Sequence, residues 1–407
     1  MGPDRSASIE SRASWVVAVT AVAILSVAFG APLIVVVALK PIAADLGEAR
    51  AVPALASSLV YLGAGAGGIL MGWLSGRIGT RSVAVAGAAM VSAGLVLASG
   101  GAAWQLLVGY GLLVGFLGNG ALFPPMMAYV SQWFDRRRGT ALALVSSGQY
   151  IAGALWPALL ERAVAGIGWQ RTMQVYAAFV LAVAVPLALL VLRPAPALPP
   201  PGSPWAGPRA GAPVLGMHPN LALALLAIAS FLCCVPMAMP AAHLVAFCTD
   251  LGIAASRGAM MLSVLLVSAF LARQFWGWVS DRIGGLPTVL LGSMAQVVGM
   301  AGFLMTQDEA GLFFVAAAYG LGFSGIVPAY MLAVRELFPA REAAWRMPML
   351  LFLSLSGMAF GAWLAGALHD RFGNYAVAWE AGILVNLVQL ALVGLLLRRQ
   401  GRRAGAA

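Results

Sequence analysis

The chain has 407 residues, of which 61% are hydrophobic and 9% are charged, and its formal net charge is +10. A soluble domain carries roughly 25% charged residues, so this composition cannot cover a water-facing surface and excludes a soluble enzyme or binding module. The positive charge does not indicate nucleic-acid binding, because the basic residues lie in short gaps between apolar runs. The bulk composition therefore predicts an integral membrane protein.

Twelve apolar segments follow one another along the chain, each close to the roughly 20 residues that a membrane-spanning helix needs. The first follows the polar stretch Met1–Ser14 and is too long for a cleaved signal sequence, so we interpret it as a transmembrane helix. Helices are expected because a lipid-exposed backbone must satisfy its hydrogen bonds within the segment. The segments cover residues 15–39, 53–75, 83–100, 103–130, 140–161, 170–192, 219–248, 258–280, 286–306, 311–334, 347–368 and 375–397.

The distribution of basic residues predicts the orientation. With the N-terminus placed inside, seventeen of the 24 Lys and Arg residues fall on the inner side and six on the outer side, and Arg273 is the one left within a span. By the positive-inside rule, both termini are expected in the cytoplasm. The chain is thus predicted to be a multi-pass protein of a bacterial cytoplasmic (inner) membrane, and topology rather than a partner accounts for most of its charge.

A stretch rich in Pro, Gly and Ala separates the sixth and seventh segments. Such a composition cannot continue a helix and is typical of a semi-rigid or disordered linker. The sequence therefore predicts an N-terminal six-helix bundle at 1–192, a cytoplasmic linker at 193–218 and a C-terminal six-helix bundle at 219–407.

The two halves repeat an octet. Gly72–Gly79 reads GWLSGRIG and Gly277–Gly284 reads GWVSDRIG, with six of eight positions identical at an offset of 205 residues. Both octets lie between the second and third spans of their half. Repeats on this scale build many transporters, with the substrate site where the halves meet.

Catalytic, metal and cofactor patterns are not found in the sequence. Cys233, Cys234 and Cys248 lie in one apolar run without a Cys-x-x-Cys pair, which argues against a disulfide framework or a zinc site. The only lysine is Lys40, so there is no P-loop, and no H-E-x-x-H or paired carboxylates occur within a span. We expect no catalytic residues, no metal, no cofactor and no enzymatic activity.

Arg273 is the one basic residue well inside a predicted span, and no acidic residue lies well inside any span. Placing Arg near the bilayer centre costs about 2.5–3.5 kcal/mol on insertion scales, so it is expected to face the protein interior or a water-filled cavity. A guanidinium fork matches a carboxylate bidentately. We therefore predict that Arg273 binds an anionic substrate; capping by backbone carbonyls or snorkelling is the alternative.

Other polar residues near mid-span are candidates for a substrate site. Because histidine side chains in general titrate near neutrality, His243 could carry a coupling proton, although a lone His on an apolar helix also serves in packing. The remaining candidates could donate hydrogen bonds to a substrate or bridge helices. They are Tyr61, Asn119, Gln149, Tyr150 and Ser354.

The octet resembles the loop signature of the major facilitator superfamily, roughly G-x-L-x-D-R-x-G-R-R. The acidic position of that signature is Gly76 in the first copy and Asp281 in the second. The resemblance implies the major facilitator fold, an all-α integral membrane protein with twelve transmembrane helices in two six-helix bundles. It also implies that the motif residues control conformational gating. These are Gly72, Arg77, Gly79, Arg81, Gly277, Asp281, Arg282 and Gly284, together with Leu74 as a further match.

A finer resemblance covers most of the chain. Trp133–Gly139 (WFDRRRG), Ser147-Gly148 and Gly168-Trp169, with Phe270, Ala272 and Arg273, are similar to the monocarboxylate transporter and oxalate/formate antiporter branch. The branch has an arginine in this helix that binds the substrate carboxylate, which implies that role for Arg273. Mammalian members also carry an aspartate one turn earlier and a lysine in the first helix, where this chain has Ala269 and Leu33.

The sequence as a whole predicts a secondary active transporter of a small monocarboxylate such as lactate or pyruvate. We expect a proton-coupled symporter that functions as a monomer in the lipid bilayer, with the carboxylate and protons as its partners and no nucleic acid. Two alternatives remain open: an organic-anion antiporter or exporter of larger, aromatic carboxylates, and a non-transporting receptor or intramembrane enzyme. The lack of a paired nucleophile and base, and of a signalling domain, argues against the second.

Overall fold

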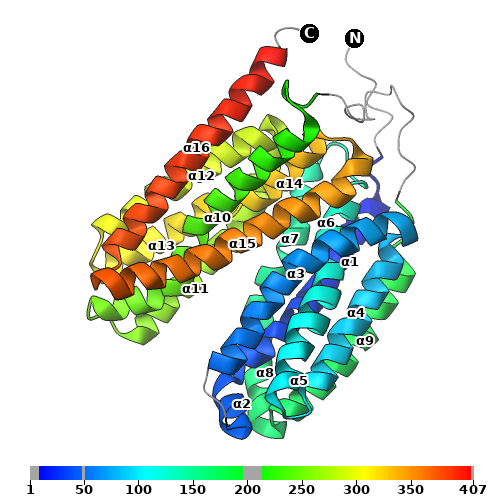
Figure 1. Cartoon of the computed structure of the whole chain (residues 1–407), viewed down its shortest axis with the longest axis vertical. Helices are drawn as coiled ribbons and strands as arrows, with labels where there is room; N and C mark the ends of the chain where they lie inside the picture. The colour runs from blue at the N-terminus through cyan, green and yellow to red at the C-terminus, as the bar shows by residue number, and fades with distance from the viewer. Residues whose placement is uncertain (1–8, 48–50, 196–212, 405–407) are drawn as a thin grey trace. The chain divides into compact units, whose positions relative to one another are not determined.

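The computed structural model describes residues 9–47, 51–195 and 213–404 (Figure 1). Within these ranges the chain is helical apart from short connections and one isolated bridge between Val214 and Met217. Eleven helical segments there are long and apolar enough to cross a membrane. This confirms the predicted all-α membrane architecture. The predicted segment 140–161 is not among the eleven, because two helices, α7 (Arg138–Ser146) and α8 (Gly148–Ile167), occupy it and meet at Ser147.

The described chain forms two compact units. Unit 1 contains Met1–Arg136, Leu144–Pro199 and Ala340–Phe352, and unit 2 contains Arg137–Ala143, Pro200–Pro339 and Leu353–Ala407. Residues 137–143 thus cluster with unit 2 and residues 340–352 with unit 1, although each lies in the other sequence half. The division at a linker stays a prediction, since residues 196–212 lie outside the described part of the chain.

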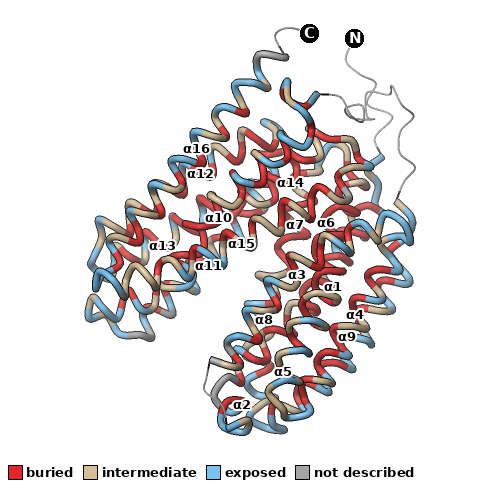
Figure 2. The backbone as a smooth tube through the Cα atoms, viewed as in Figure 1, coloured by how far each residue is buried: buried red, intermediate tan, exposed pale blue. Residues whose placement is uncertain are grey.

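Unit 1 is built on α3 and α4, which pack against the long segment that contains the π-helix η2. α3 contacts η2 and α6, α4 contacts η2 and α9, and α1 contacts α8 and α9. Ala, Val, Leu and Ile residues are buried in the interior, whereas many large apolar residues are exposed, as expected of lipid-facing helices. Figure 2 shows how buried and exposed positions alternate along the helices. The helices are α1 (Arg12–Val37), α2 (Leu39–Leu46), α3 (Ala51–Ile78), α4 (Thr80–Ala98), α5 (Ala103–Val108), η2 (Gly109–Asn119), α6 (Gly120–Val130), α8 (Gly148–Ile167) and α9 (Trp169–Val191).

Close packing in unit 1 depends on glycine, and this gives a stability prediction. A Cβ on Gly67 of α3 would overlap the backbone oxygen of Phe116 in η2, whereas a Cβ on Gly153 of α8 would meet nothing within 4 Å. Overpacking a core typically costs about 1–3 kcal/mol. Gly67→Ala is therefore expected to lower the thermal unfolding midpoint, followed by tryptophan fluorescence in detergent, by several degrees, and Gly153→Ala to leave it unchanged or higher. Equal midpoints would contradict this packing.

Unit 2 is built on α10, which packs against α11 and α16. α12 packs against α16 and α13, and α13 also packs against α11. α10 begins with Pro219 at its first turn, where a missing N–H is harmless, after His218, whose Nδ1 accepts a hydrogen bond from the Asn220 N–H at 3.3 Å. The helices are α10 (Pro219–Asp250), α11 (Ala255–Ile283), α12 (Gly285–Met305), α13 (Glu309–Phe323), α14 (Ile326–Leu337) and α16 (Ala376–Ala404); α7 (Arg138–Ser146) and α15 (Ala340–Phe372) each have one part in this unit.

Candidate functional site

The two octets adopt the same local structure. Ser75 Oγ donates to the Gly72 carbonyl at 2.8 Å, and Ser280 Oγ donates to the Gly277 carbonyl at 2.8 Å. Each octet ends in a glycine at positive φ, 85° in Gly79 and 87° in Gly284, a conformation that side chains with a Cβ rarely adopt. The sequence repeat is therefore also a structural repeat, in which α3 passes into α4 as α11 passes into α12.

The arginine of each octet lies on a tryptophan one turn before it. The Arg77 guanidinium is 3.8 Å from the ring centroid of Trp73, and the Arg282 guanidinium is 3.4 Å from that of Trp278. Such cation–π contacts are worth about 0.5–1 kcal/mol at exposed sites. They hold both guanidinium groups against the helix that carries them.

The octets differ at their acidic position. Asp281 accepts hydrogen bonds from the backbone N–H of Gly139, from the Thr140 N–H at 3.0 Å and from the Thr140 hydroxyl. A carboxylate placed on the first turn of α7 is favourable because the unsatisfied N–H groups carry partial positive charge. Close approach requires Gly277, whose Cβ would come within 2.9 Å of the Thr140 Cα. Gly76, the counterpart of Asp281, offers no such acceptor.

Arg273 is 2% exposed and lies near the middle of the candidate span Met260–Ile283. A charge there, removed from water and lipid, is the type of intramembrane residue that marks substrate or ion pathways. Ala269, one turn earlier, is fully buried. The side chain of Arg273 is thus buried in the middle of the span and not at a helix end.

The helix around Arg273 is held tightly against α13. A Cβ on Gly320 of α13 would overlap the Leu265 carbonyl, and a Cβ on Gly325, which precedes α14, would overlap the Trp276 side chain. These glycines therefore allow close contact on both sides of Arg273. Trp276 Nε1 also donates to the Leu321 carbonyl at 2.7 Å. This packing fixes the position from which the Arg273 side chain extends.

Two other predicted residues lie in unit 2, in different environments. Ser354 is buried, and its hydroxyl bonds that of Ser230 across α15 and α10. His243 is half-buried: Nε2 faces the Ala362 carbonyl at 2.8 Å, so it must donate, and Nδ1 faces the Tyr375 hydroxyl at 3.0 Å. A protonated ring could keep both contacts, because a hydroxyl can also accept.

The remaining predicted polar residues lie in unit 1. Asn119 is 1% exposed at the end of the π-helix η2, and its amide has no hydrogen-bond partner among the described residues. π-Helical turns within α-helices are frequently found at functional sites. Tyr61 is 46% exposed, and Gln149 and Tyr150 are half-buried at the start of α8. The predicted set is therefore divided between the two units.

Sequence reasoning missed a second group of buried polar residues in unit 2. Gln296 Nε2 donates to the Cys233 carbonyl at 3.2 Å, and Gln389 Nε2 donates to the Tyr330 hydroxyl at 3.0 Å. Asn386 is fully buried, and its amide has no partner within the described ranges. Asn386 and Gln389 are three residues apart, which places both on one helix face. This spacing is the sequence signal that could have identified these two residues.

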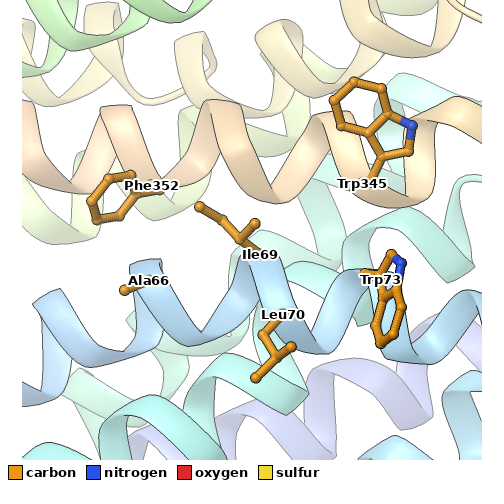
Figure 3. Close-up of a pocket in the computed structure, with 6 residues that line it drawn as sticks. All are labelled: Ala66, Ile69, Leu70, Trp73, Trp345 and Phe352. Atoms are coloured by element: carbon orange, nitrogen blue, oxygen red, sulfur yellow. The ribbon is translucent and has the colours of Figure 1, made fainter.

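An apolar cavity of about 480 Å³ lies in unit 1 between α3 and the beginning of α15. Figure 3 shows its lining, which is almost entirely hydrocarbon and aromatic. The lining residues are Ala66, Ile69, Leu70, Trp73, Trp345 and Phe352. Such a surface can hold an apolar or aromatic group, but it has no charged side chain to orient an anion.

The fold and the duplicated octets define a helical membrane protein built from two structurally repeated halves. The sequence profile of the Major Facilitator Superfamily matches residues 16–306 and 221–406, and the chain belongs to this family of membrane transporters, which are not enzymes.

The chain is 26% identical over 384 residues to human monocarboxylate transporter 11, covering 90% of this chain and 79% of that protein. It is 28% identical over 320 residues to rat monocarboxylate transporter 13, covering 75% and 71%. The solved structure of the E. coli fucose:proton symporter FucP superposes with a TM-score of 0.72 at 14% identity, covering 93% of this chain and 98% of FucP, which supports the fold alone.

Proposed function

We propose that this chain is a secondary active transporter of a small monocarboxylate, such as lactate or pyruvate, coupled to protons and working by alternating access. The observation that carries the proposal is Arg273, a buried guanidinium in the middle of a membrane span. A planar fork of donors suits a carboxylate, and the similarity to monocarboxylate transporters 11 and 13 supports this substrate class. Arg273 would bind the carboxylate, with Ser354, Asn119, Tyr61, Gln149 and Tyr150 as further substrate contacts.

His243 is our candidate for the coupling proton. Both ring nitrogens have partners that are compatible with either protonation state. The bias of basic residues supports a bacterial cytoplasmic membrane with both termini inside, and we propose that the monomer is the functional unit.

The experiment is uptake of a panel of labelled carboxylates into proteoliposomes, with and without an inward proton gradient. We expect saturable uptake of a short monocarboxylate that an acidic exterior stimulates, and loss of the acid stimulation in His243→Asn. If exchange persists without any pH dependence, the chain is an anion antiporter instead. Absence of both uptake and exchange for the whole panel would contradict transport of a carboxylate.

A second candidate function is export of a larger, aromatic carboxylate. The observation that favours it is the apolar cavity lined by Trp73 and Trp345 (Figure 3), because burying an aromatic group releases roughly 25 cal/mol per Å² of apolar surface. In the same liposomes, preference for aryl carboxylates over lactate, together with reduced transport by Trp345→Ala, would support this function over the first.

A further inference from the structure

A second cavity, of about 520 Å³, lies in unit 1 where α4 and α15 begin. Three arginines, Arg81, Arg193 and Arg341, are among the residues that line it, together with Gly76 and Gln132. No acidic residue is part of the described lining. Within the described part of the chain, none of the three arginines forms an ion pair. The cavity is therefore a concentration of positive charge without a matching anion.

The structural repeat shows what occupies the corresponding place in unit 2. An offset of 205 residues pairs Gly76 with Asp281. An offset of 204 residues pairs Gln132 with Glu336, and the same offset aligns one proline with a proline and one phenylalanine with a phenylalanine. Asp281 binds the first turn of α7, and Glu336 accepts a hydrogen bond from the Gly285 N–H at 3.0 Å, at the first residue of α12. Two carboxylates therefore satisfy two helix beginnings in unit 2.

Both carboxylates are missing from the unit 1 copy. α4 and α15 begin without a side-chain hydrogen bond to their first turn. A Cβ on Gly76 would meet nothing within 4 Å, so the space that Asp281 fills in the other copy is open. The acid in the first turn of α15, Glu342, already pairs with Arg346 at 2.7 Å. The cavity thus combines three cations, two free helix beginnings and the volume for an anion.

We propose that this cavity binds a phosphate-class anion, which takes the place of the two carboxylates of the other copy. Arginine forks match phosphate oxygens bidentately, and unsatisfied N–H groups at helix beginnings attract the same charge. Two sources supply this chemistry: the headgroup of an anionic phospholipid, which basic pockets between membrane helices bind, and inorganic phosphate. The site is separate from Arg273 and does not depend on the identity of the transported substrate.

The test compares the thermal midpoint of the full chain in nanodiscs of phosphatidylcholine alone, of phosphatidylcholine with phosphatidylglycerol, and of phosphatidylcholine with added phosphate at constant ionic strength. We expect wild type to gain several degrees in at least one anion-containing arm. Gly76→Asp, which supplies a tethered carboxylate, and Arg341→Gln should lose most of that gain. The isostere Gly76→Asn and the exposed arginine variant Arg398→Gln should keep it.

The arms separate the sources. A response to phosphatidylglycerol alone identifies a lipid headgroup, and a response to phosphate as well identifies a site for the small anion. The proposal is overturned if wild type responds to neither anion. It is also overturned if Arg398→Gln loses the response as fully as Arg341→Gln, because the effect would then be general surface charge. Gly76→Asp and Arg341→Gln act by different means, so misfolding of one leaves the other decisive.

Discussion

Arg273→Gln is expected to reduce carboxylate transport at least about 100-fold while the protein still folds. A hydrogen bond to a charged group contributes about 1.5–3 kcal/mol, a bidentate pair supplies two, and each 1.4 kcal/mol is a factor of ten in affinity. Glutamine keeps much of the side-chain volume at this 2% exposed position, so folding should survive. Arg273→Lys keeps the charge but loses the fork, and should retain part of the activity.

The matched control is Arg257→Gln on the same helix. Arg257 lies near the beginning of α11 and pairs with Glu309 at 2.7 Å on the surface, where ion pairs contribute little. Uptake in proteoliposomes and the rise in thermal midpoint with added carboxylate measure transport and binding separately. Loss of uptake with a retained midpoint shift would mean that Arg273 serves the conformational change, and normal uptake would refute its role altogether.

The architecture was accessible from the sequence because lipid restricts the choices of the backbone. Long apolar runs must form helices in a membrane, and the octet repeat marks both crossings from α3 to α4 and from α11 to α12. The interruption at Ser147 was not predicted: hydropathy measures apolar length, and residues 140–161 are apolar enough on both sides of the break between α7 and α8. The π-helix η2 was also missed, because its extra residue per turn leaves no mark in composition.

The candidate site was only partly accessible. Arg273 could be identified because a single charge in an apolar run carries its own cost. Gln296, Asn386 and Gln389 were overlooked because their amides carry no charge, although burying an amide without a hydrogen bond also costs free energy. The partner of Asp281 could not be found from the sequence at all, since Gly139 is 142 residues away and contributes only its backbone N–H.

Asp281 is the second residue at which we expect a large effect. Its carboxylate accepts three hydrogen bonds from Gly139 and Thr140. These residues belong to the segment 137–143, which clusters with unit 2 although the chain on both sides belongs to unit 1. We propose that Asp281 holds this segment in unit 2 during one stage of the transport cycle, so that its loss shifts the conformational equilibrium.

Asp281→Ala is expected to speed amide hydrogen exchange at residues 137–143 roughly tenfold or more, because the lost bonds are worth about 1.4 kcal/mol or more together. Asp281→Asn keeps one acceptor oxygen, so its exchange rate at residues 137–143 should lie between those of Asp281→Ala and wild type. Asp308→Asn is the control, because Asp308 accepts from the Gly311 N–H at 2.7 Å as the cap of α13 and asparagine caps equally well. Unchanged exchange at residues 137–143 in Asp281→Ala would refute the proposal that Asp281 holds this segment in unit 2.

The asymmetry between the octets sharpens this expectation. A protein with an acid in both copies would retain one contact after a single substitution, whereas here Gly76 offers no second carboxylate and one change removes the only octet acid. Exchange at the beginning of α4, which no side chain caps and which makes no contact with Asp281, should stay unchanged in Asp281→Ala. Transport rates should change in the same variant without loss of carboxylate binding, because Arg273 is not part of this contact; a parallel loss of binding would show that the two sites are one coupled unit.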